Sequence, residues 1–142
     1  HCVTRRQRQM CIRDSPDLEI VINGGISSIE DSINHLKVLD GVMVGREAYT
    51  NPYLLAEVDQ KIYGQDKPII KREEIAEKFC EYIDNEMRKG TKLHSMTRHM
   101  LGLFRGVKGA KQFRRYLSEN AYSENASIDV LYNALSKTEG AT

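Results

Sequence analysis

Two segments of the chain carry the residue types from which phosphate-binding loops are built. Asn23-Gly24-Gly25 follows a short apolar run, and Gly45-Arg46 ends a second apolar run that begins 23 residues after the first. Glycines let backbone N–H groups approach a phosphate, the N-terminus of a following helix favours negative charge, and arginine adds a bidentate contact. A Gly-Gly pair can equally make a tight turn, and Arg46 can be a solvated charge. Because glycines occur at the ends of two consecutive predicted strands, we favour a phosphate site.

The second candidate site is a basic segment, residues 87–118, that contains no Asp or Glu. Ion pairs at the i,i+4 spacing of a helix therefore cannot form within it. The helix predicted near residue 113 buries one apolar side and presents a cationic stripe beside it. The candidates for contact with a phosphate backbone are Lys111 and Arg115 on this stripe, Arg114 at its border, and Arg98 upstream. The alternative is a solvated face that is balanced by acids from elsewhere in the protein.

Histidine and tyrosine side chains in the same half could also meet RNA, by direct contact or by base stacking. His99 either contacts RNA or completes the helix packing, and for a lone histidine packing is favoured. Tyr116, Tyr122 and Tyr132 have no spacing that defines a stacking platform, so we assign them to packing.

A repeated unit of strand and helix positions the two glycine segments. Residues 18–23 predict a buried strand, and a helix follows with Ser27 or Ser28 as its N-cap. Residues 41–45 predict the next strand, and Asn51-Pro52 marks the start of the next helix. Two strands joined by a helix pair in parallel with a right-handed crossover. Such a sheet needs cover on both faces, which two strands cannot provide.

Residues 64–68 form a polar turn cluster, which indicates a domain boundary. Beyond this cluster the apolar residues recur only at helical spacing, in four segments. The segments are marked by Ile75, Phe79, Ile83 and Met87; by Leu93, Met96, Met100, Leu103 and Phe104; by Ala110, Phe113 and Leu117; and by Ile128, Leu131 and Leu135. Short connecting loops favour antiparallel neighbours. We therefore predict an α/β region at residues 16–66 followed by an all-α helical bundle at residues 67–142.

Charge is segregated along the chain although the overall balance is near neutral. The 142 residues include 21 basic and 20 acidic residues, yet residues 16–66 carry a net charge of −6 and residues 67–142 a net charge of +4. The composition, 40% hydrophobic and 29% charged, is that of an ordinary globular domain. No uncharged run approaches the roughly 18 apolar residues that span a bilayer. These features exclude a membrane protein and a disordered chain, and the basic half favours a polyanionic partner.

The first fifteen residues have no apolar periodicity and no initiator Met, and they match neither a signal peptide nor a transit helix. Residues 5–15, RRQRQMCIRDS, resemble the conceptual translation of a sequencing adapter, so we exclude residues 1–15 from the fold as non-native. The alternative is a basic disordered arm that helps to hold nucleic acid. If the segment is not native, we expect the protein to begin upstream and this chain to be its C-terminal piece.

The three cysteines share no metal-ligand spacing and are too scattered for a disulfide framework. We therefore predict no metal site and a reducing, cytoplasmic location. Cys80 falls on the apolar side of a predicted helix, while Cys2 and Cys11 lie in the excluded segment. None of the three is assigned to catalysis.

Three runs of sequence stand out together: IVINGGI, DGVMVGREAYTNPYLL and TRHMLGLFRGVKGAKQFRRYLSENA. Over the chain from about Pro16 to near its end, they resemble the C-terminal part of the bacterial tRNA-dihydrouridine synthases of the A subfamily. Many flavin-binding barrels share a strand ending in NGG and another ending in GR, whereas the other motifs are particular to this subfamily. The resemblance implies the last two β/α units of an FMN-binding TIM barrel, followed by a helical domain that grips tRNA.

The resemblance also implies an activity and the residues that serve it. NADPH reduces FMN, the flavin passes hydride to a D-loop uridine at position 20 or 20a of tRNA, and a cysteine protonates the neighbouring carbon. The implied FMN-phosphate contacts are Asn23, Gly24 and Gly25 after the seventh strand, and Gly45 and Arg46 after the eighth. The implied contacts with the D-loop and elbow of tRNA are Lys111 and Arg114, supported by Arg115 and Arg98. The expected protein is a cytoplasmic monomer.

The catalytic cysteine of this family lies in the N-terminal half of the barrel, together with most contacts to the flavin ring and the uridine. We therefore expect the 142-residue chain to lack activity by itself. Two alternatives remain open. One is a non-catalytic helical RNA-binding module, and the other is a different FMN barrel oxidoreductase, such as a dihydroorotate dehydrogenase. The basic segment without acids argues against the second alternative.

Overall fold

The structure, a computed structural model, describes residues 17–138, and the chain divides into two compact units after Glu47. The predicted non-native segment, residues 1–15, lies outside the described residues, as do Cys2 and Cys11. Within residues 17–138, no helix is both long enough and apolar enough to cross a membrane.

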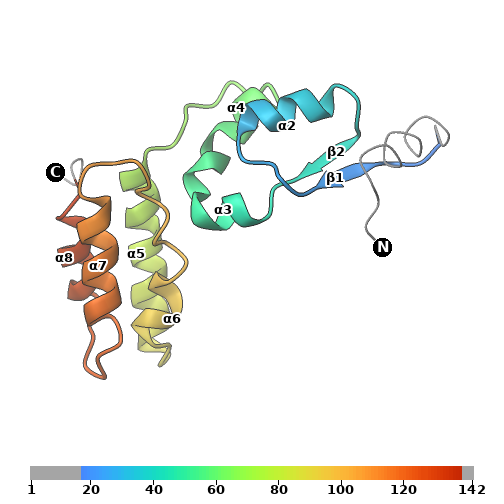
Figure 1. The fold of residues 1–142 in the computed structure, drawn as a ribbon. Coiled ribbons are helices and arrows are strands. Elements are labelled where there is room, and N and C mark those ends of the chain that lie inside the picture. The colour runs from blue at the N-terminus through green and yellow to red at the C-terminus, as the bar shows by residue number, and fades with distance from the viewer. Residues whose placement is uncertain (1–16, 139–142) are drawn as a thin grey trace. The chain divides into compact units, whose positions relative to one another are not determined.

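The first unit contains a strand, a helix and a strand in the predicted order (Figure 1). β1 (Val21–Asn23) and β2 (Gly41–Met43) pair in parallel, with Asn23 opposite Met43. α2 (Ile29–Leu36) connects the two strands. The parallel pairing predicted from the sequence is therefore confirmed.

Ser28 determines where α2 begins. Its side-chain oxygen accepts a hydrogen bond from the backbone N–H of Asp31 at 3.0 Å, so Ser28 rather than Ser27 is the N-cap. α2 buries Ile29 and Ser32, and the Ser32 hydroxyl donates to the backbone carbonyl of Ser28 at 3.0 Å. The buried hydroxyl therefore has a hydrogen-bond partner, as burial requires.

Both strands are shorter than the apolar runs that predicted them, and they leave apolar surface exposed. Val21 and Met43 are 54% and 53% exposed, and Leu18, which precedes β1, is 64% exposed. Parallel sheets normally have both faces covered, because their strands are apolar on both sides. Within the described residues, α2 contacts β2, but part of this sheet remains exposed although it has the composition of a buried sheet.

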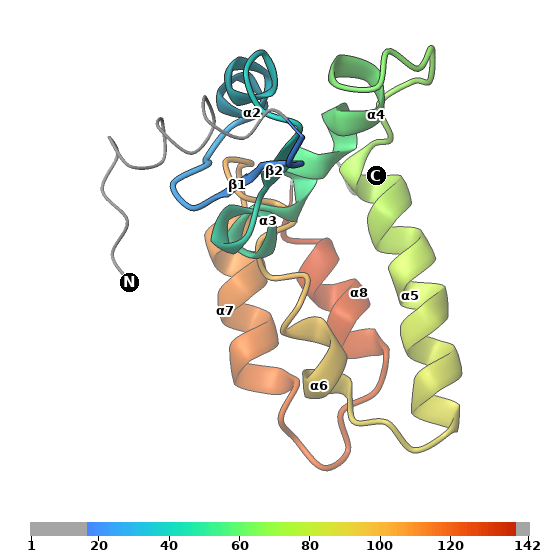
Figure 2. The ribbon, with the colours of Figure 1, turned by 90° about the vertical axis from the view of Figure 1, so that its right-hand side faces the viewer.

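The second unit is helical (Figure 2). Its elements are the 3-10 helix η1 (Pro52–Glu57) and the helices α4 (Val58–Lys61), α5 (Arg72–Arg88), α6 (Leu93–Thr97), α7 (Ala110–Asn120) and α8 (Asp129–Leu135), while α3 (Arg46–Thr50) spans the division between the units. α7 and α8 lie side by side and run in opposite directions, and α6 contacts both α5 and α7. Their apolar sides form one core, whose most buried members include Ile83, Leu93, Phe104, Phe113, Leu117 and Leu131.

The second predicted helix of this unit differs most from the sequence-based expectation. Its apolar residues are buried as predicted, but α6 ends at Thr97 and residues 98–107 form mainly successive turns. Most of the hydrogen-bonded N–H groups in these turns bond the carbonyl three residues back. A Cβ atom on Gly102 would lie only 2.3 Å from the carbonyl oxygen of Thr50. The turns therefore bring a glycine backbone against another segment, an approach that a larger side chain would block.

The helix predicted after Asn51-Pro52 is divided into η1 and α4, and the Asn51 side chain makes no capping hydrogen bond. The hydroxyl of Tyr53 on η1 donates to the carbonyl of Ile70 at 3.0 Å. The Cζ atom of Arg72 lies 3.7 Å from the centroid of the Tyr53 ring. These contacts tie η1 to the start of α5, so the compact units divide earlier in the chain than the turn cluster at residues 64–68.

Gly109, which precedes α7, lies close to the backbone of Lys137. Its φ is +87°, and a Cβ atom there would lie 1.9 Å from the carbonyl oxygen of Lys137. Gly106 has a similar φ of +83° but no atom within 4 Å of a Cβ position, so it provides a matched control. We expect Gly106→Ala to lower the free energy of unfolding by about 1–2 kcal/mol. Gly109→Ala should lower it by about 2–5 kcal/mol, because overpacking adds to the strain.

The measurement is urea-induced unfolding followed by circular dichroism. Equal losses in the two variants would show that the Lys137 carbonyl does not restrict position 109.

Candidate functional site

The parallel register of β1 and β2 brings the two predicted glycine segments to the same edge of the sheet. Asn23 is paired with Met43, so Gly24 and Gly25 leave the sheet beside the segment that leads to Gly45. Neighbouring strands lie about 4.8 Å apart, which places both loops within reach of one small anion. The structure therefore brings together the residues that the sequence predicted for a phosphate site.

The backbone at this edge is open and requires glycine. Gly24 and Gly25 have φ values of +108° and +75°, which side chains with a Cβ atom rarely adopt. No heavy atom outside the neighbouring residues lies within 4 Å of a Cβ position at Gly24, Gly25 or Gly45. All three glycines are also exposed, so an anion could approach the backbone at this edge.

Acidic residues in the first turn of α2 offset part of the positive potential at its N-terminus. Glu30 and Asp31 lie in its first turn. A hydrogen bond at 3.0 Å from the Ser27 hydroxyl to Oδ2 of Asp31, together with the Ser28 cap, lowers the pKa of Asp31 below its usual value. The Asp31 carboxylate is therefore charged near the helix terminus, where it already meets the helix dipole. Arg46, exposed at the start of α3, is the basic residue that adjoins the glycine segments.

The basic residues predicted to contact nucleic acid are all exposed. Lys111, Arg114 and Arg115 lie on the outer side of α7, and Arg98 follows α6 directly. The opposite side of α7 is buried through Ala110, Phe113 and Leu117. The predicted division of α7 into an apolar side and a cationic side is confirmed.

Acidic residues that flank the basic segment neutralise part of it, which agrees in part with the alternative of a face balanced by acids from outside the segment. The Nε atom of Arg115 lies 2.7 Å from Oε1 of Glu119, and this contact raises the pKa of Arg115. At the other end of the segment, Arg88 pairs with Asp84 and Lys89 with Glu86. Within residues 17–138, by contrast, the side chains of Arg98, Lys111 and Arg114 have no acidic partner.

Two tyrosines that were assigned to packing are exposed instead, so that assignment is wrong for Tyr122 and Tyr132, at 67% and 54% exposure. Packing needs contacts with distant elements, which the spacing of tyrosines along a sequence does not report. The Tyr122 ring stacks on His94, with ring centroids 4.6 Å apart and an angle of 16° between the planes. His99 is also exposed and makes an edge contact with Tyr49 rather than a core contact.

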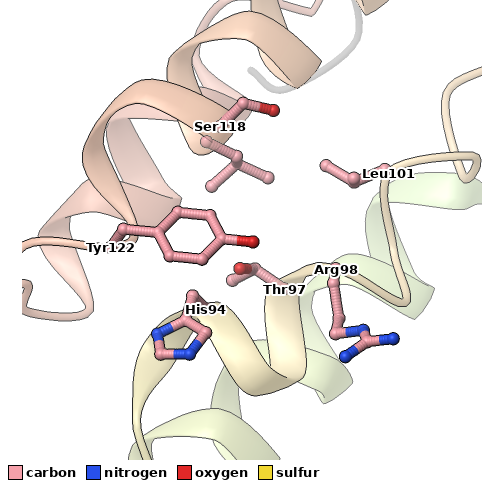
Figure 3. A pocket seen from close by; sticks show the side chains of 7 residues that line it. His94, Thr97, Arg98, Leu101, Ser118 and Tyr122 are labelled. Atoms are coloured by element: carbon pink, nitrogen blue, oxygen red, sulfur yellow. The ribbon is translucent and has the colours of Figure 1, made fainter.

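The sequence analysis missed a small pocket between α6 and the C-terminal end of α7 (Figure 3). It is lined by His94, Thr97, Arg98, Leu101, Leu117, Ser118 and Tyr122. Of these residues, the sequence analysis had singled out only Arg98 as a contact. A histidine and an arginine in the basic segment, with a tyrosine shortly after it, were the available signal, but the sequence did not show that their side chains meet.

Comparison with known proteins assigns the family. The family described as dihydrouridine synthase (Dus) matches residues 8–139, which is most of the chain. The chain belongs to the dihydrouridine synthase family. The match includes both glycine segments and the basic segment, and it begins within residues 1–15.

Curated relatives of this dihydrouridine synthase chain share about half of its residues. A protein of Vibrio cholerae serotype O1 is 53% identical over 125 residues, which are 88% of this chain and 38% of the relative. Proteins of Shewanella oneidensis and Escherichia coli K12 are 53% and 51% identical over 84% and 87% of this chain, and each match covers 36% of the relative. All three are named tRNA-dihydrouridine(20/20a) synthase. The chain thus spans just over a third of the length of these relatives.

Cys80 of this dihydrouridine synthase chain lies on α5, within the hydrophobic core. Burial, and to a smaller extent the nearby charge of Glu77, raises the pKa of the Cys80 thiol to about 11. A thiol in this environment is neither a ready nucleophile nor a ready proton donor.

We predict that Cys80 is unreactive in the folded chain. In a variant with Cys2→Ser and Cys11→Ser, only Cys80 can react with a thiol reagent such as dithionitrobenzoate. At pH 8 about 0.1% of a thiol with a pKa near 11 is ionised, against about a quarter of an ordinary thiol. Labelling should therefore be about a hundredfold slower, or more, without denaturant than in concentrated urea. Equal rates would show that Cys80 is accessible and ionisable in the native state.

Proposed function

We propose that this chain is the C-terminal part of an FMN-dependent tRNA-dihydrouridine(20/20a) synthase, which reduces D-loop uridines of tRNA with NADPH. Residues 16–66 are the last two β/α units of its TIM barrel, and residues 67–142 are its tRNA-binding domain. The observation that carries the proposal is the parallel register of β1 and β2, because it brings two glycine loops to one edge in a member of this family. The names of the relatives support tRNA as the substrate.

The exposed strand residues support the barrel assignment. Val21 and Met43 are more than half exposed in strands of a type that is normally covered on both faces. In a barrel, one face of each strand packs against the interior layers and the other against surrounding helices. We propose that these residues are buried in the complete enzyme.

The residues at the glycine edge fit the phosphate of a flavin mononucleotide. Gly24, Gly25 and Gly45 are exposed and have open space at their Cβ positions, and Asn23 and Arg46 adjoin them in the sequence. Arg46 would supply the positive charge that the acidic first turn of α2 does not. A bound flavin supplies hydride transfer, and the role of these residues is to hold and orient its phosphate.

The outer side of α7 fits a tRNA backbone. We propose that Lys111 and Arg114 contact phosphates of the D-loop and elbow, with Arg115 and Arg98 in support. Lys111, Arg114 and Arg98 have no acidic partner among the described residues, so phosphates would meet uncompensated charges. Arg115 would exchange its contact with Glu119 for one with RNA. We assign no residue of this chain to catalysis, and we propose a cytoplasmic monomer.

In the complete enzyme, we expect Arg46→Ala to weaken FMN binding by about tenfold or more. The substitution removes one charge-assisted contact, worth about 1.5–3 kcal/mol. Lys37→Ala is the matched control, since it removes one exposed positive charge immediately after the opposite end of α2. A titration of flavin fluorescence gives both affinities. Equal affinities for the Arg46 and Lys37 variants would remove Arg46 from the flavin site.

In the same enzyme, replacing Lys111, Arg114 and Arg115 together by Ala should weaken tRNA binding and flatten its salt dependence. Each lost phosphate contact reduces the slope of log affinity against log salt by about 0.7–0.9. A variant with Lys67, Lys71 and Lys78 replaced by Ala loses the same charge outside the basic segment and should keep the slope. Circular dichroism checks that both variants fold. An unaltered slope in the first variant would show that the outer side of α7 is only solvated.

A further inference from the structure

The pocket between α6 and α7 has no role in the function proposed above. Its apolar lining comes from Leu101 and Leu117, and its polar side chains include Thr97 and Ser118. The cavity itself is small, about 40 Å³, and is partly open to solvent. Figure 3 shows the Tyr122 ring extending along this space, with the rings of Tyr122 and His94 side by side at its mouth.

Tyr122 is held in position and yet accessible. Its contact with His94, at 4.6 Å and 16°, orders the ring, while 67% of the residue remains exposed. An ordered aromatic ring with free surface is the feature on which unpaired bases of RNA stack. An exposed tyrosine without such support would lose more side-chain entropy when a base binds.

The charge around the pocket favours an anionic ligand, and the exposed Tyr122 ring is what favours a nucleotide among anions. Arg98 lines the pocket, and its guanidinium has no acidic partner within the described part of the chain. None of the lining residues is acidic. Figure 3 shows the Arg98 guanidinium directed away from the Tyr122 ring, so a phosphate of the RNA would meet this charge at the outer rim of the pocket.

The pocket also continues the cationic side of α7. Lys111, Arg115 and Ser118 are separated by four and three residues, so they lie in one row along the helix. At 1.5 Å per residue, the row is about 10 Å long from Lys111 to Ser118. An RNA strand that follows the two cations would therefore pass directly to the pocket that Ser118 lines.

We propose that one unpaired nucleotide of the bound RNA lies over this pocket, with its base stacked on the exposed Tyr122 ring and a phosphate of the same strand at Arg98. The inference rests on the proposed function, because it assumes that RNA lies along α7. The pocket would thus recognise an unpaired base, whereas the cations of α7 contact only phosphates.

The test uses the whole chain and two fluorescent RNA probes of equal length, a stem–loop with a uridine loop and a blunt-ended duplex. Tyr122→Leu should weaken binding to the stem–loop by about fivefold or more, the usual loss for one stacked base. It should leave the salt slope and duplex binding unchanged, since no charge is lost and a duplex offers no free base. Tyr122→Phe keeps the ring and should bind as the wild type does.

Tyr132→Leu is the matched control, because Tyr132 is an exposed tyrosine on α8 outside the pocket, and it should have no effect on either probe. Arg98→Gln should weaken binding to the stem–loop and lower its salt slope by about 0.7.

Wild-type affinity of Tyr122→Leu for the stem–loop would overturn the pocket assignment, as would an equal loss for both probes. If the triple variant of α7 still flattens the salt dependence in that case, the proposed tRNA surface stands without the pocket. Failure of the wild-type chain to bind the stem–loop would overturn both.

Discussion

The contact between Phe104 and Phe113 determines how α7 is rotated about its axis, and the surface of the helical unit depends on that rotation. The two rings are at most 1% exposed, and their centroids lie 5.0 Å apart at an angle of 64°. Burying an aromatic side chain contributes about 1.5–3 kcal/mol, and an edge contact adds about 0.5–1.5 kcal/mol. With Phe113 held inward, Lys111 and Arg114 must face solvent. The cationic surface is therefore a consequence of core packing.

The turns at residues 98–107 link this core to the surroundings of the pocket. Nε of Arg72 donates to the carbonyl of Leu103 at 2.9 Å, while its guanidinium covers the Tyr53 ring. Gly102 lets the same turns approach Thr50 more closely than any side chain would allow. These contacts and the buried Phe104 fix the turns that begin at Arg98, which is the C-cap of α6 and lines the pocket.

The glycine edge and the basic surface use different physical means to favour an anion. At the glycine edge the proposed contacts come from the backbone, since Gly24 and Gly25 are exposed and adopt φ values that favour glycine. The capped and acidic start of α2 offsets part of the favourable potential there, which leaves Arg46 as the adjoining source of charge. On α7 the proposed contacts come from charged side chains, and Glu119 neutralises only Arg115 among them.

Sequence periodicity and capping residues were enough to predict the parallel strand pair, the N-cap of α2 as one of two serines, and the buried sides of α5, α7 and α8. These features depend on neighbours within a few residues, so local spacing reports them. The end of α6 at Thr97, the exposure of Tyr122 and its stacking on His94 could not be predicted in the same way. Each depends on which distant segments meet, such as Gly102 against Thr50, or α6 against the end of α7. Residue types and spacing therefore determined the helices and their charge, whereas long-range packing decided which side chains share a surface.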